Sequence, residues 1–508
     1  MTESWQMLTT LLKKEEVLIL KNLKKLTILH SNDMHGDFLS KTVDKKLIGG
    51  VSMLSGYVQK VRRENENVIY AIAGDMFRGS LIDSEFKGIS TIEIMNLLAP
   101  DVVTLGNHEV DYGLAHLLFL EKCAKFPIIN ANMYITINHK RLFRSHIVLK
   151  IGGMKILFIG ILTEEVLNST RQEKLIGSLV DIEDAAKEVG RICNSYRSTD
   201  IDFTVLLTHI GIESDKRLAA ALDPRWGVDA IIGGHSHTLL EKPEMVAGIP
   251  IVQAAVGTAQ IGRFDIMVDT DNNCIDSFNW ELIPIDEAHC PRDLELEDVI
   301  EKYKTVTDAK YGRIVTRFMR KYTHPARNMP TELGGIFADA LREGMDMDVM
   351  FLASGSIRKK ELGPMVRLQD LMEVFPFDQE LLQITVTGAQ LRRMILHLMR
   401  PEAFTGETEF YQFSKGFLVR YNRETRQLEE LSLNGREITD DQLIRIGLQS
   451  YHAGNLPDFF GITKEEVLKN GEFRELATSC CDLAEEYFNA RKLIRADRNP
   501  RLIFTEQK

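Results

Sequence analysis

The sequence predicts a layered α/β protein of two domains, and three observations support this prediction. From residue 26 onward, short apolar segments with strand character alternate with longer segments that have helical periodicity. A charged helical segment interrupts this alternation, and a second α/β segment follows it. The chain has 508 residues, which exceeds one ordinary core and suggests two or three domains of roughly 150–200 residues each.

The strands of the first α/β segment are short apolar runs bounded by turn residues. We expect them at 26–31, 67–74, 102–107, 127–132, 155–162, 203–209, 229–234 and 249–255. Between two of these runs, residues 49–65 have the periodicity of an amphipathic helix. Two alternating runs within 263–285 flank Asp271, Asn272 and Asn273, which predicts a hairpin that closes the domain.

These patterns predict four segments along the chain. They are an unassigned N-terminal arm at 1–25, an α/β domain at 26–290, a linker helix at 291–315 and a second, smaller α/β domain at 316–508. The linker is charged and contains no glycine before Gly312, as expected of a continuous helix. Neither the arm nor residues 466–508 contain a motif that we can interpret.

The composition excludes several classes of protein. Apolar residues make up 44% and charged residues 27%, which is typical of folded globular proteins and excludes a disordered chain. Lys and Arg total 62 against 73 Asp and Glu, so the net charge is −11. Proteins that follow long nucleic acids normally carry a basic surplus, so this role is disfavoured. A small anionic substrate bound in a local basic pocket remains compatible with the charge.

The sequence also predicts a cytoplasmic protein without a membrane segment. No run of about 18 apolar residues is present, as a transmembrane helix requires. The apolar runs near the N-terminus are broken by Lys13, Lys14, Glu15 and Glu16, unlike those of a secretory signal. The 6 cysteines have no CxxC spacing and are expected to be free thiols in a reducing compartment. The oligomeric state is not predicted.

Potential metal ligands follow five of the predicted strands directly. Because ligand sites of open α/β sheets form beyond the carboxyl ends of the strands, all five motifs have access to one crevice. One such motif alone is weak evidence, since an isolated His or a Gly-Asp turn is common. If none of these residues bound a metal, five such motifs would each have to follow a strand by coincidence. The motifs are Asp33-Met34-His35, Gly74-Asp75, Gly106-Asn107-His108-Glu109, Thr208-His209 and Gly234-His235-Ser236-His237.

These donors suit two divalent cations. Mixed oxygen and nitrogen ligands favour Mn, Zn, Co, Fe or Mg over a thiolate site. Asp75 can bridge two ions about 3.5–4 Å apart. Such a pair lowers the pKa of a bound water and neutralises phosphoryl oxygens during in-line attack.

His108 and Asp111 form a second candidate feature. In a helical turn, residues three apart share a face, so Asp111 can hold the tautomer of His108. His108 would then stabilise phosphoryl oxygens or protonate the leaving group. In the alternative interpretation, Asp111 only supplies an acidic residue to the first helical turn.

The ordered motifs SNDMHGD, AGDMFRGS, TLGNHEVDYG, LLTHIGIESD and IIGGHSHT resemble those of calcineurin-like metallophosphoesterases, specifically the two-domain 5′-nucleotidase family. The resemblance implies a four-layer α/β/β/α N-terminal domain and a smaller α/β substrate domain. It also implies two metal sites and a catalytic dyad. One metal would be held by Asp33, His35, Asp75 and His237, the other by Asp75, Asn107, His209 and His235, and His108 and Asp111 would form the dyad.

Residues 348–391 resemble the C-terminal domain of 5′-nucleotidases. They contain a predicted strand, a small-residue turn with Arg358 and the Phe375-Pro376-Phe377 element. The planar fork of an arginine is well suited to phosphate oxygens, so the resemblance implies substrate binding by Arg358. The alternative is a solvated basic cluster with Lys359 and Lys360.

The resemblance further implies that two aromatic side chains stack on the nucleobase, as aromatic rings do in many nucleic-acid sites. Phe413 is the best match for the first, with Phe410 as the alternative, although aromatic residues of a strand often belong to the core. Tyr451 matches the second. The sequence departs from the family pattern after Tyr451, where Gly454-Asn455-Leu456-Pro457-Asp458 replaces a GGDGY-like stretch.

We therefore expect a two-metal phosphoesterase whose partner is a small nucleotide, with nucleoside 5′-monophosphates as the leading substrates. Two alternatives remain. One is a nucleotide-sugar or 2′,3′-cyclic-nucleotide phosphodiesterase with the same metals and a different pocket. The other is a non-catalytic nucleotide-binding sensor, which the complete ligand set and dyad disfavour.

Overall fold

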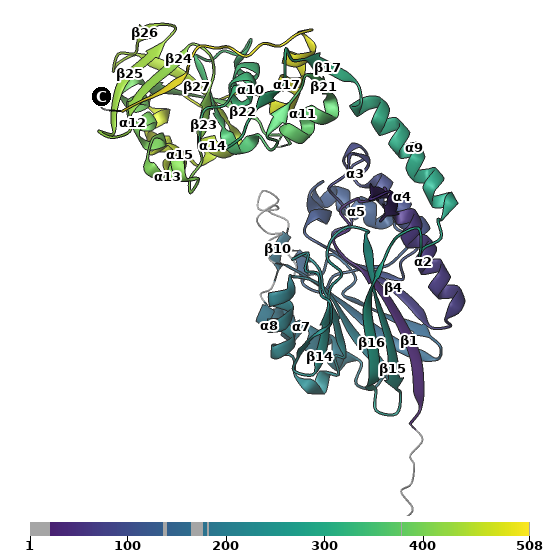
Figure 1. The fold of residues 1–508 in the computed structure, drawn as a ribbon. Coiled ribbons are helices and arrows are strands. Elements are labelled where there is room, and N and C mark those ends of the chain that lie inside the picture. Colours follow the sequence, from purple (N-terminus) through teal and green to yellow (C-terminus); the bar gives the residue numbers. More distant parts are fainter. Residues whose placement is uncertain (1–20, 136–139, 164–175, 180–181, 377, 507–508) are drawn as a thin grey trace, which may run out of the picture. The chain divides into compact units, whose positions relative to one another are not determined.

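The structure, a computed structural model, describes residues 21–135, 140–163, 176–179, 182–376 and 378–506. It divides into two compact units, unit 1 (Met1–Thr307) and unit 2 (Asp308–Lys508) (Figure 1). Helix α9 (Leu294–Tyr311) occupies most of the segment predicted as a linker, and the division falls within it. Residues 1–20 of the predicted arm and Phe377 lie outside the described residues.

The first sheet of unit 1 has six strands in the order β16-β15-β1-β4-β5-β6. β1 pairs in parallel with β4 and antiparallel with β15, so the predicted hairpin forms one edge of this sheet. The strands are β1 (Leu23–Ser31), β4 (Val68–Ala73), β5 (Val102–Thr104), β6 (Ile128–Ile129), β15 (Gln260–Asp269) and β16 (Cys274–Pro284).

The second sheet of unit 1 also has six strands, in the order β13-β14-β12-β11-β9-β8. β9, β11, β12 and β14 run parallel, and β8 and β13 pair antiparallel at the two edges. The strands are β8 (His146–Ile151), β9 (Met154–Leu162), β11 (Phe203–His209), β12 (Ala230–Ile232), β13 (Glu244–Val246) and β14 (Ile249–Val252).

Helices cover the outer face of each sheet, and the two inner faces pack together. On β9, Ile156 and Phe158 point into the core between the sheets, whereas Leu157 and Ile159 point to the outer helices. Both faces are buried, which explains why the strands are continuous apolar runs. The predicted four-layer α/β/β/α fold is confirmed. The first sheet is covered by α2 (Val51–Glu64), α3 (Leu81–Glu85), α4 (Ile89–Leu98) and α5 (Leu114–Cys123), and the second by α7 (Ile182–Ser195) and α8 (Ile212–Ala221).

Short elements complete unit 1 at the margins of the two sheets. β2 and β3 form a hairpin of exposed and half-buried residues, and β7 pairs with β10. Their bounds, with those of two 3₁₀ turns, are β2 (Lys41–Val43), β3 (Lys46–Ile48), β7 (Met133–Ile135), β10 (Ile176–Leu179), η1 (His108–Val110) and η2 (Pro224–Trp226).

Unit 2 is built on a five-stranded mixed sheet in the order β23-β19-β27-β22-β28 and a four-stranded sheet in the order β26-β25-β24-β29. One apolar core joins the two sheets and helix α12. The strands are β19 (Val349–Ala353), β22 (Leu381–Thr387), β23 (Tyr411–Phe413), β24 (Phe417–Asn422), β25 (Gln427–Leu433), β26 (Arg436–Glu437), β27 (Leu443–Gln449), β28 (Arg474–Ala477) and β29 (Leu502–Thr505).

Helices and two small strand pairs surround these sheets. β17 pairs with β21, and β18 with β20. These elements are β17 (Ile314–Arg317), β18 (Tyr322–Thr323), α10 (Glu332–Arg342), η3 (Ser354–Ser356), β20 (Glu361–Leu362), β21 (Met365–Arg367), α11 (Leu368–Val374), α12 (Gly388–Leu398), α13 (Pro401–Thr405), α14 (Ser450–Gly454), α15 (Leu456–Phe460), α16 (Lys464–Leu468) and α17 (Cys480–Asn489).

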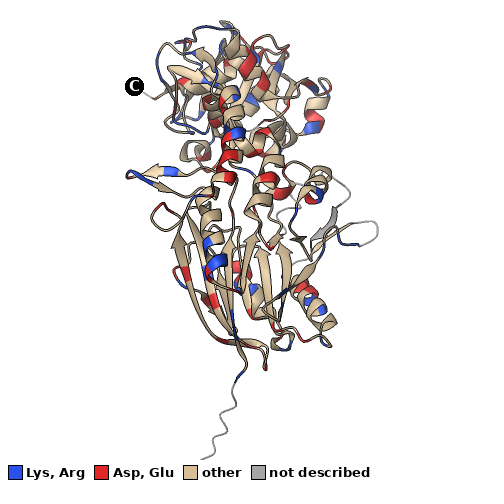
Figure 2. Ribbon diagram, turned by 90° about the vertical axis from the view of Figure 1, so that its right-hand side faces the viewer, with Lys and Arg blue, Asp and Glu red and all other residues tan. Residues whose placement is uncertain are grey.

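The charged residues of both units are of mixed sign. Acidic and basic residues are interspersed along the helices and loops (Figure 2). Among the described residues, no helix combines the length and the apolar character that crossing a bilayer requires.

Candidate active site

The predicted ligands lie in loops at the carboxyl ends of parallel strands from both sheets of unit 1. β1, β4 and β5 of the first sheet lead to Asp33 and His35, Asp75 and Asn107, and β11 and β12 of the second lead to His209 and to His235 and His237. Five of these residues, Asp33, His35, Asp75, His235 and His237, have φ between 48° and 81°. Residues other than Gly rarely adopt this left-handed conformation, and such strain concentrates at functional sites.

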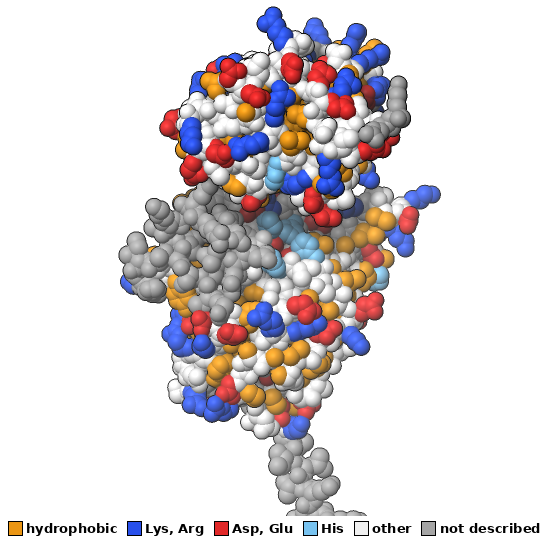
Figure 3. Space-filling view, turned by 90° about the vertical axis from the view of Figure 1, so that its left-hand side faces the viewer, with side chains coloured by type: hydrophobic (Ala, Val, Ile, Leu, Met, Phe, Trp, Pro, Cys, Tyr) orange, Lys and Arg blue, Asp and Glu red, His pale blue; other side chains and the backbone are white. Residues whose placement is uncertain are grey.

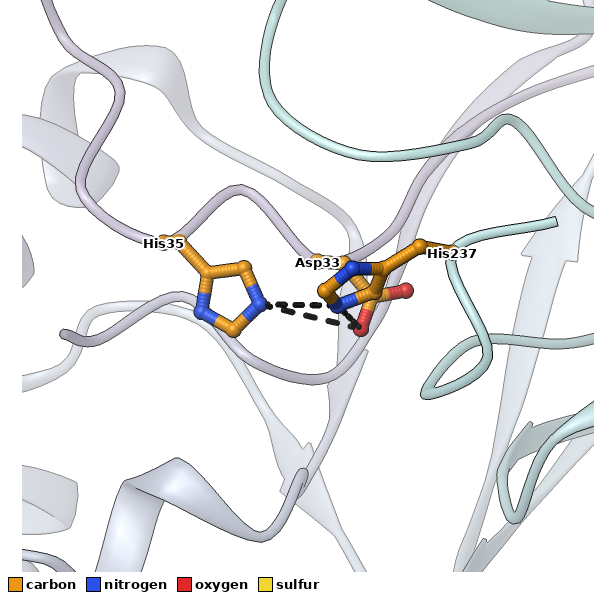
Figure 4. A group of neighbouring side chains, drawn as sticks. All are labelled: Asp33, His35 and His237. Atoms are coloured by element: carbon orange, nitrogen blue, oxygen red, sulfur yellow. Dashed lines mark hydrogen bonds and ion pairs between the residues drawn. The ribbon is translucent and has the colours of Figure 1, made fainter. Parts of the chain in front are cut away.

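Asp33, His35 and His237 form one group of donors (Figure 4). The two imidazole Nε2 atoms of His35 and His237 lie 3.1 Å apart, and His237 Nε2 lies 3.4 Å from Asp33 Oδ1. His35 Nδ1 lies 3.3 Å from the carbonyl oxygen of Phe77, which favours a proton on Nδ1 and a lone pair on Nε2. Two imidazole nitrogens and a carboxylate oxygen facing one another suit a cation.

Asn107, His209 and His235 form a second group. The Asn107 Oδ1 lies 3.1 Å from His209 Nε2 and 2.8 Å from His235 Nδ1. His209 is fully buried, and its Nδ1 lies 2.8 Å from the carbonyl oxygen of Ala73. That contact orients the ring with Nε2 toward the group, in the way that backbone carbonyls commonly orient metal-binding histidines.

Asp75 lies between the two groups. Its Oδ2 is 3.7 Å from His35 Nε2 and 3.2 Å from His209 Nε2, while its Oδ1 accepts a hydrogen bond of 2.9 Å from the amide of His108. Although burial disfavours charge on both groups, the attraction between Asp75 and His209 lowers the pKa of Asp75 and raises that of His209. The oxygen and nitrogen donors therefore fit a divalent cation, and Asp75 Oδ2 lies close to a donor nitrogen of each group.

His108 and Asp111 are joined by a contact of 2.7 Å between Nδ1 and Oδ2. They lie in and directly after the 3₁₀ turn η1 rather than in an α-helix, so residues three apart are adjacent. The contact with Asp111 is the main cause that raises the pKa of His108. The His108 ring packs edge-on against His35 at a centroid distance of 5.3 Å, beside the candidate metal ligands.

The cluster reaches the surface of unit 1. The side chains of His35, His108 and His237 are 18%, 37% and 45% exposed, and a group of histidines is visible in the space-filling view (Figure 3). By contrast, Asp33, Asp75 and His209 are buried beneath them. A small solute can therefore reach the donors from one side.

Two further residues of this site were not predicted from the sequence. Glu109 is buried, and its carboxylate accepts hydrogen bonds from the amides of Gly106, Asp75 and Met76 at 2.5, 3.0 and 2.7 Å. It thus ties together the two loops that carry Asp75 and Asn107. Arg78 contacts Asp111 through Nε at 2.8 Å. The only sequence signal for either residue is its place inside a ligand motif.

Unit 2 has a pocket of about 700 Å³ whose lining includes Arg358, Tyr451, Phe410 and Phe459. Its size exceeds the roughly 300 Å³ at which small-molecule sites begin. The predicted Arg358 and Tyr451 therefore share one pocket. Arg327 and Arg400 add cationic groups to it.

The structure places Phe413 outside the residues that line this pocket. Its side chain is 3% exposed and packs in the core of unit 2, with ring centroids 4.8 Å from Phe351 and 5.2 Å from Phe417. It is not among the residues that line the pocket of Arg358 and Tyr451, whereas Phe410, the alternative, is. Phe410 is also buried in this core, at 2% exposed, so it borders both the core and the pocket.

Comparison with known proteins assigns both parts of the chain. Residues 26–239 match the model of calcineurin-like phosphoesterases, and residues 307–460 match that of the 5′-nucleotidase C-terminal domain. Each part of the chain is thus similar to one of the two domains of 5′-nucleotidases. The chain is a hydrolase that acts on phosphoester bonds.

Relatives of similar length share both parts. The 5′-nucleotidase of Mus musculus is 27% identical over 506 residues, covering 88% of this chain and 85% of the relative. A solved structure of a 5′-nucleotidase precursor from Thermus thermophilus has a TM-score of 0.64 at 21% identity, covering 95% and 99% of the two chains. The NAD nucleotidase of Haemophilus influenzae has a TM-score of 0.58 at 18% identity, covering 96% and 100%. These two structural matches concern the fold.

Proposed function

We propose that this chain is a dinuclear metal-dependent phosphomonoesterase that hydrolyses nucleoside 5′-monophosphates to nucleoside and phosphate. One observation carries the proposal. Two groups of nitrogen and oxygen donors share Asp75, whose Oδ2 is 3.7 Å from His35 Nε2 and 3.2 Å from His209 Nε2. Asp33, His35, Asp75 and His237 would hold one ion, and Asp75, Asn107, His209 and His235 the other.

The bound ions would activate a water molecule and neutralise phosphoryl oxygens. The side chains of His108 and Asp111 would supply the remaining catalytic groups. Asp111 keeps a proton on His108 Nδ1 through the 2.7 Å contact, which directs Nε2 away from Asp111. A protonated Nε2 donates a hydrogen bond to a phosphoryl oxygen as charge develops there, or passes its proton to the leaving oxygen.

The choice of a nucleotide substrate is supported by unit 2. Its pocket combines arginine side chains, which bind phosphate and hydroxyl oxygens, with the exposed ring of Tyr451 and the ring of Phe459. The relatives named 5′-nucleotidase cover most of the chain, which also favours nucleoside monophosphates over the alternatives.

A substrate screen tests the proposal. Release of phosphate is measured for AMP, UDP-glucose and 2′,3′-cyclic AMP, each with Mn, Zn, Co or Mg. We expect AMP to have the highest kcat/KM with at least one metal. A higher value for UDP-glucose or for cyclic AMP would replace the proposal with a phosphodiesterase. Binding of AMP without turnover under any metal would instead indicate a sensor.

A further inference from the structure

Arg78 is held beside the dyad by its backbone. It lies in the loop after β4, with φ of 68° in the left-handed region. Its amide donates a hydrogen bond of 2.8 Å to Asp83 Oδ2, and the same oxygen accepts a hydrogen bond of 2.6 Å from the hydroxyl of Tyr112. Asp83 is fully buried, and its other oxygen accepts from Thr91. One buried carboxylate thus fixes both Arg78 and the residue that follows Asp111.

The side chain of Arg78 meets the dyad itself. Its Nε donates to Asp111 Oδ2 at 2.8 Å, and this is the oxygen that lies 2.7 Å from His108 Nδ1. The planar guanidinium and the imidazole therefore approach one carboxylate oxygen together. The Arg78 side chain is 53% exposed.

A carboxylate with a single partner can rotate about its side-chain bonds and leave the productive geometry. A second donor on the same oxygen restricts that rotation, and a small misplacement of a catalytic group is costly. Arg78 is suited to this task because its backbone is anchored through Asp83 to the same segment as Asp111. Its Nε–H lies in a rigid plane, unlike the freely rotating ammonium of a lysine.

We propose that Arg78 is a positioning residue for phosphoester hydrolysis, which holds the Asp111 carboxylate so that Oδ2 accepts the Nδ1–H of His108. This rests on the proposed role of His108 in the reaction. It does not depend on which phosphoester is the substrate. Arg78 thus acts through Asp111 and does not need to touch the substrate.

The first test is the steady-state kinetics of R78Q and R78K with p-nitrophenyl phosphate and with AMP. For R78Q we expect kcat to fall about 10-fold with KM within about twofold, because a positioning contact acts in the transition state. R78K, which keeps a donor, should lose about threefold or less. Metal content should be unchanged. A matched control is R225Q, since Arg225 also donates Nε to an aspartate of unit 1, Asp223, but at a place on the surface where the Arg225 side chain is 80% exposed.

The second test is a double-mutant cycle with D111N. If Arg78 acts through Asp111, R78Q should change kcat by less than about twofold in the D111N background. A full additional loss there, a rise in KM, loss of metal, or an unchanged kcat of R78Q would overturn the proposal. A crystal structure of R78Q should also show Asp111 rotated away from His108 Nδ1, and an unmoved Asp111 would contradict it.

The two substrates separate this inference from the proposed function. p-Nitrophenyl phosphate has no nucleoside, so it reports on the phosphoester site alone. If AMP is not hydrolysed but R78Q slows p-nitrophenyl phosphate turnover as expected, the positioning role of Arg78 is supported and the proposed nucleotidase function is contradicted. If AMP is hydrolysed and R78Q has no effect on either substrate, the positioning role fails and the proposed function stands.

Discussion

The amide oxygen of Asn107 lies 2.8 Å from Nδ1 of His235, although the two residues come from different sheets of unit 1. Asn107 follows β5 of the first sheet and His235 follows β12 of the second. Their distance is therefore set by how the two inner faces pack, because no local turn joins them. The apolar core between the sheets fixes the spacing of the candidate metal site.

Replacement of His108 by Ala should separate chemistry from metal binding. The backbone amide of His108 donates to Asp75 Oδ1, and this contact remains in H108A, so we expect the ligand positions to survive the change. We expect kcat to fall by roughly 10²–10⁴, the usual range for acid–base and electrostatic groups, with metal content unchanged. H289A is a matched control, since His289 makes a similar 2.7 Å contact with Asp286 outside the site. An unchanged kcat would remove His108 from the mechanism.

Replacement of Asp111 by Asn should move the alkaline limb of the pH–rate profile. The contact with Asp111 raises the pKa of His108, so the imidazolium persists to higher pH than it otherwise would. Activity that needs the protonated ring is complete below this pKa and is lost as the pH rises through it. D111N removes the carboxylate that raises the pKa of His108, so the alkaline limb should shift to lower pH and kcat should fall. A limb that stays in place would assign it to another group.

Glu109 should be required for the stability of unit 1. E109A leaves buried amides of the Asp75 and Asn107 loops without their acceptor, which we expect to lower the free energy of unfolding by about 3 kcal/mol. Urea denaturation followed by tryptophan fluorescence measures this in unit 1, because the 3 tryptophans (Trp5, Trp226 and Trp280) all belong to it. The exposed Glu281 provides the control E281A. Equal stability of the two variants would contradict the assigned role.

Tyr451 should affect nucleotide recognition and not the phosphoester chemistry. Its side chain is 59% exposed at the pocket of unit 2, so Y451A should leave the fold intact. Loss of base stacking costs about 1–3 kcal/mol, which corresponds to an increase in KM for AMP of roughly 5- to 150-fold. Turnover of p-nitrophenyl phosphate should not change, and Y451F should behave as the parent. If both substrates were affected equally, Tyr451 would not be a nucleoside contact.

The sequence predicted the architecture of unit 1 well because its strands are buried on both faces. Such strands are continuous apolar runs, and five of the predicted ones lead to a polar motif, as with β1 before Asp33 or β11 ending at His209. The order of motifs alone then indicates that they meet at one edge. The left-handed backbone of Asp33 and His235 could not be predicted, since neither residue type requires it and the packed loops impose it.

Two features of the site depend on three-dimensional detail that the sequence does not contain. Phe413 and Phe410 both belong to the apolar core of unit 2, and only the packing in three dimensions shows which of the two also lines the pocket. The contact between Arg78 and Asp111 depends on the buried carboxylate of Asp83. The spacing from His108 marks Asp111 in the sequence, but no periodicity or spacing marks Arg78 as its second partner.

The most direct test of the central claim is a metal titration of the metal-depleted protein, with phosphate release from AMP as the readout. The two donor groups that share Asp75 predict that the depleted protein is inactive. They also predict that activity rises to its maximum only as the second ion per chain binds. Full activity without metal, or with one ion per chain, would contradict the dinuclear mechanism.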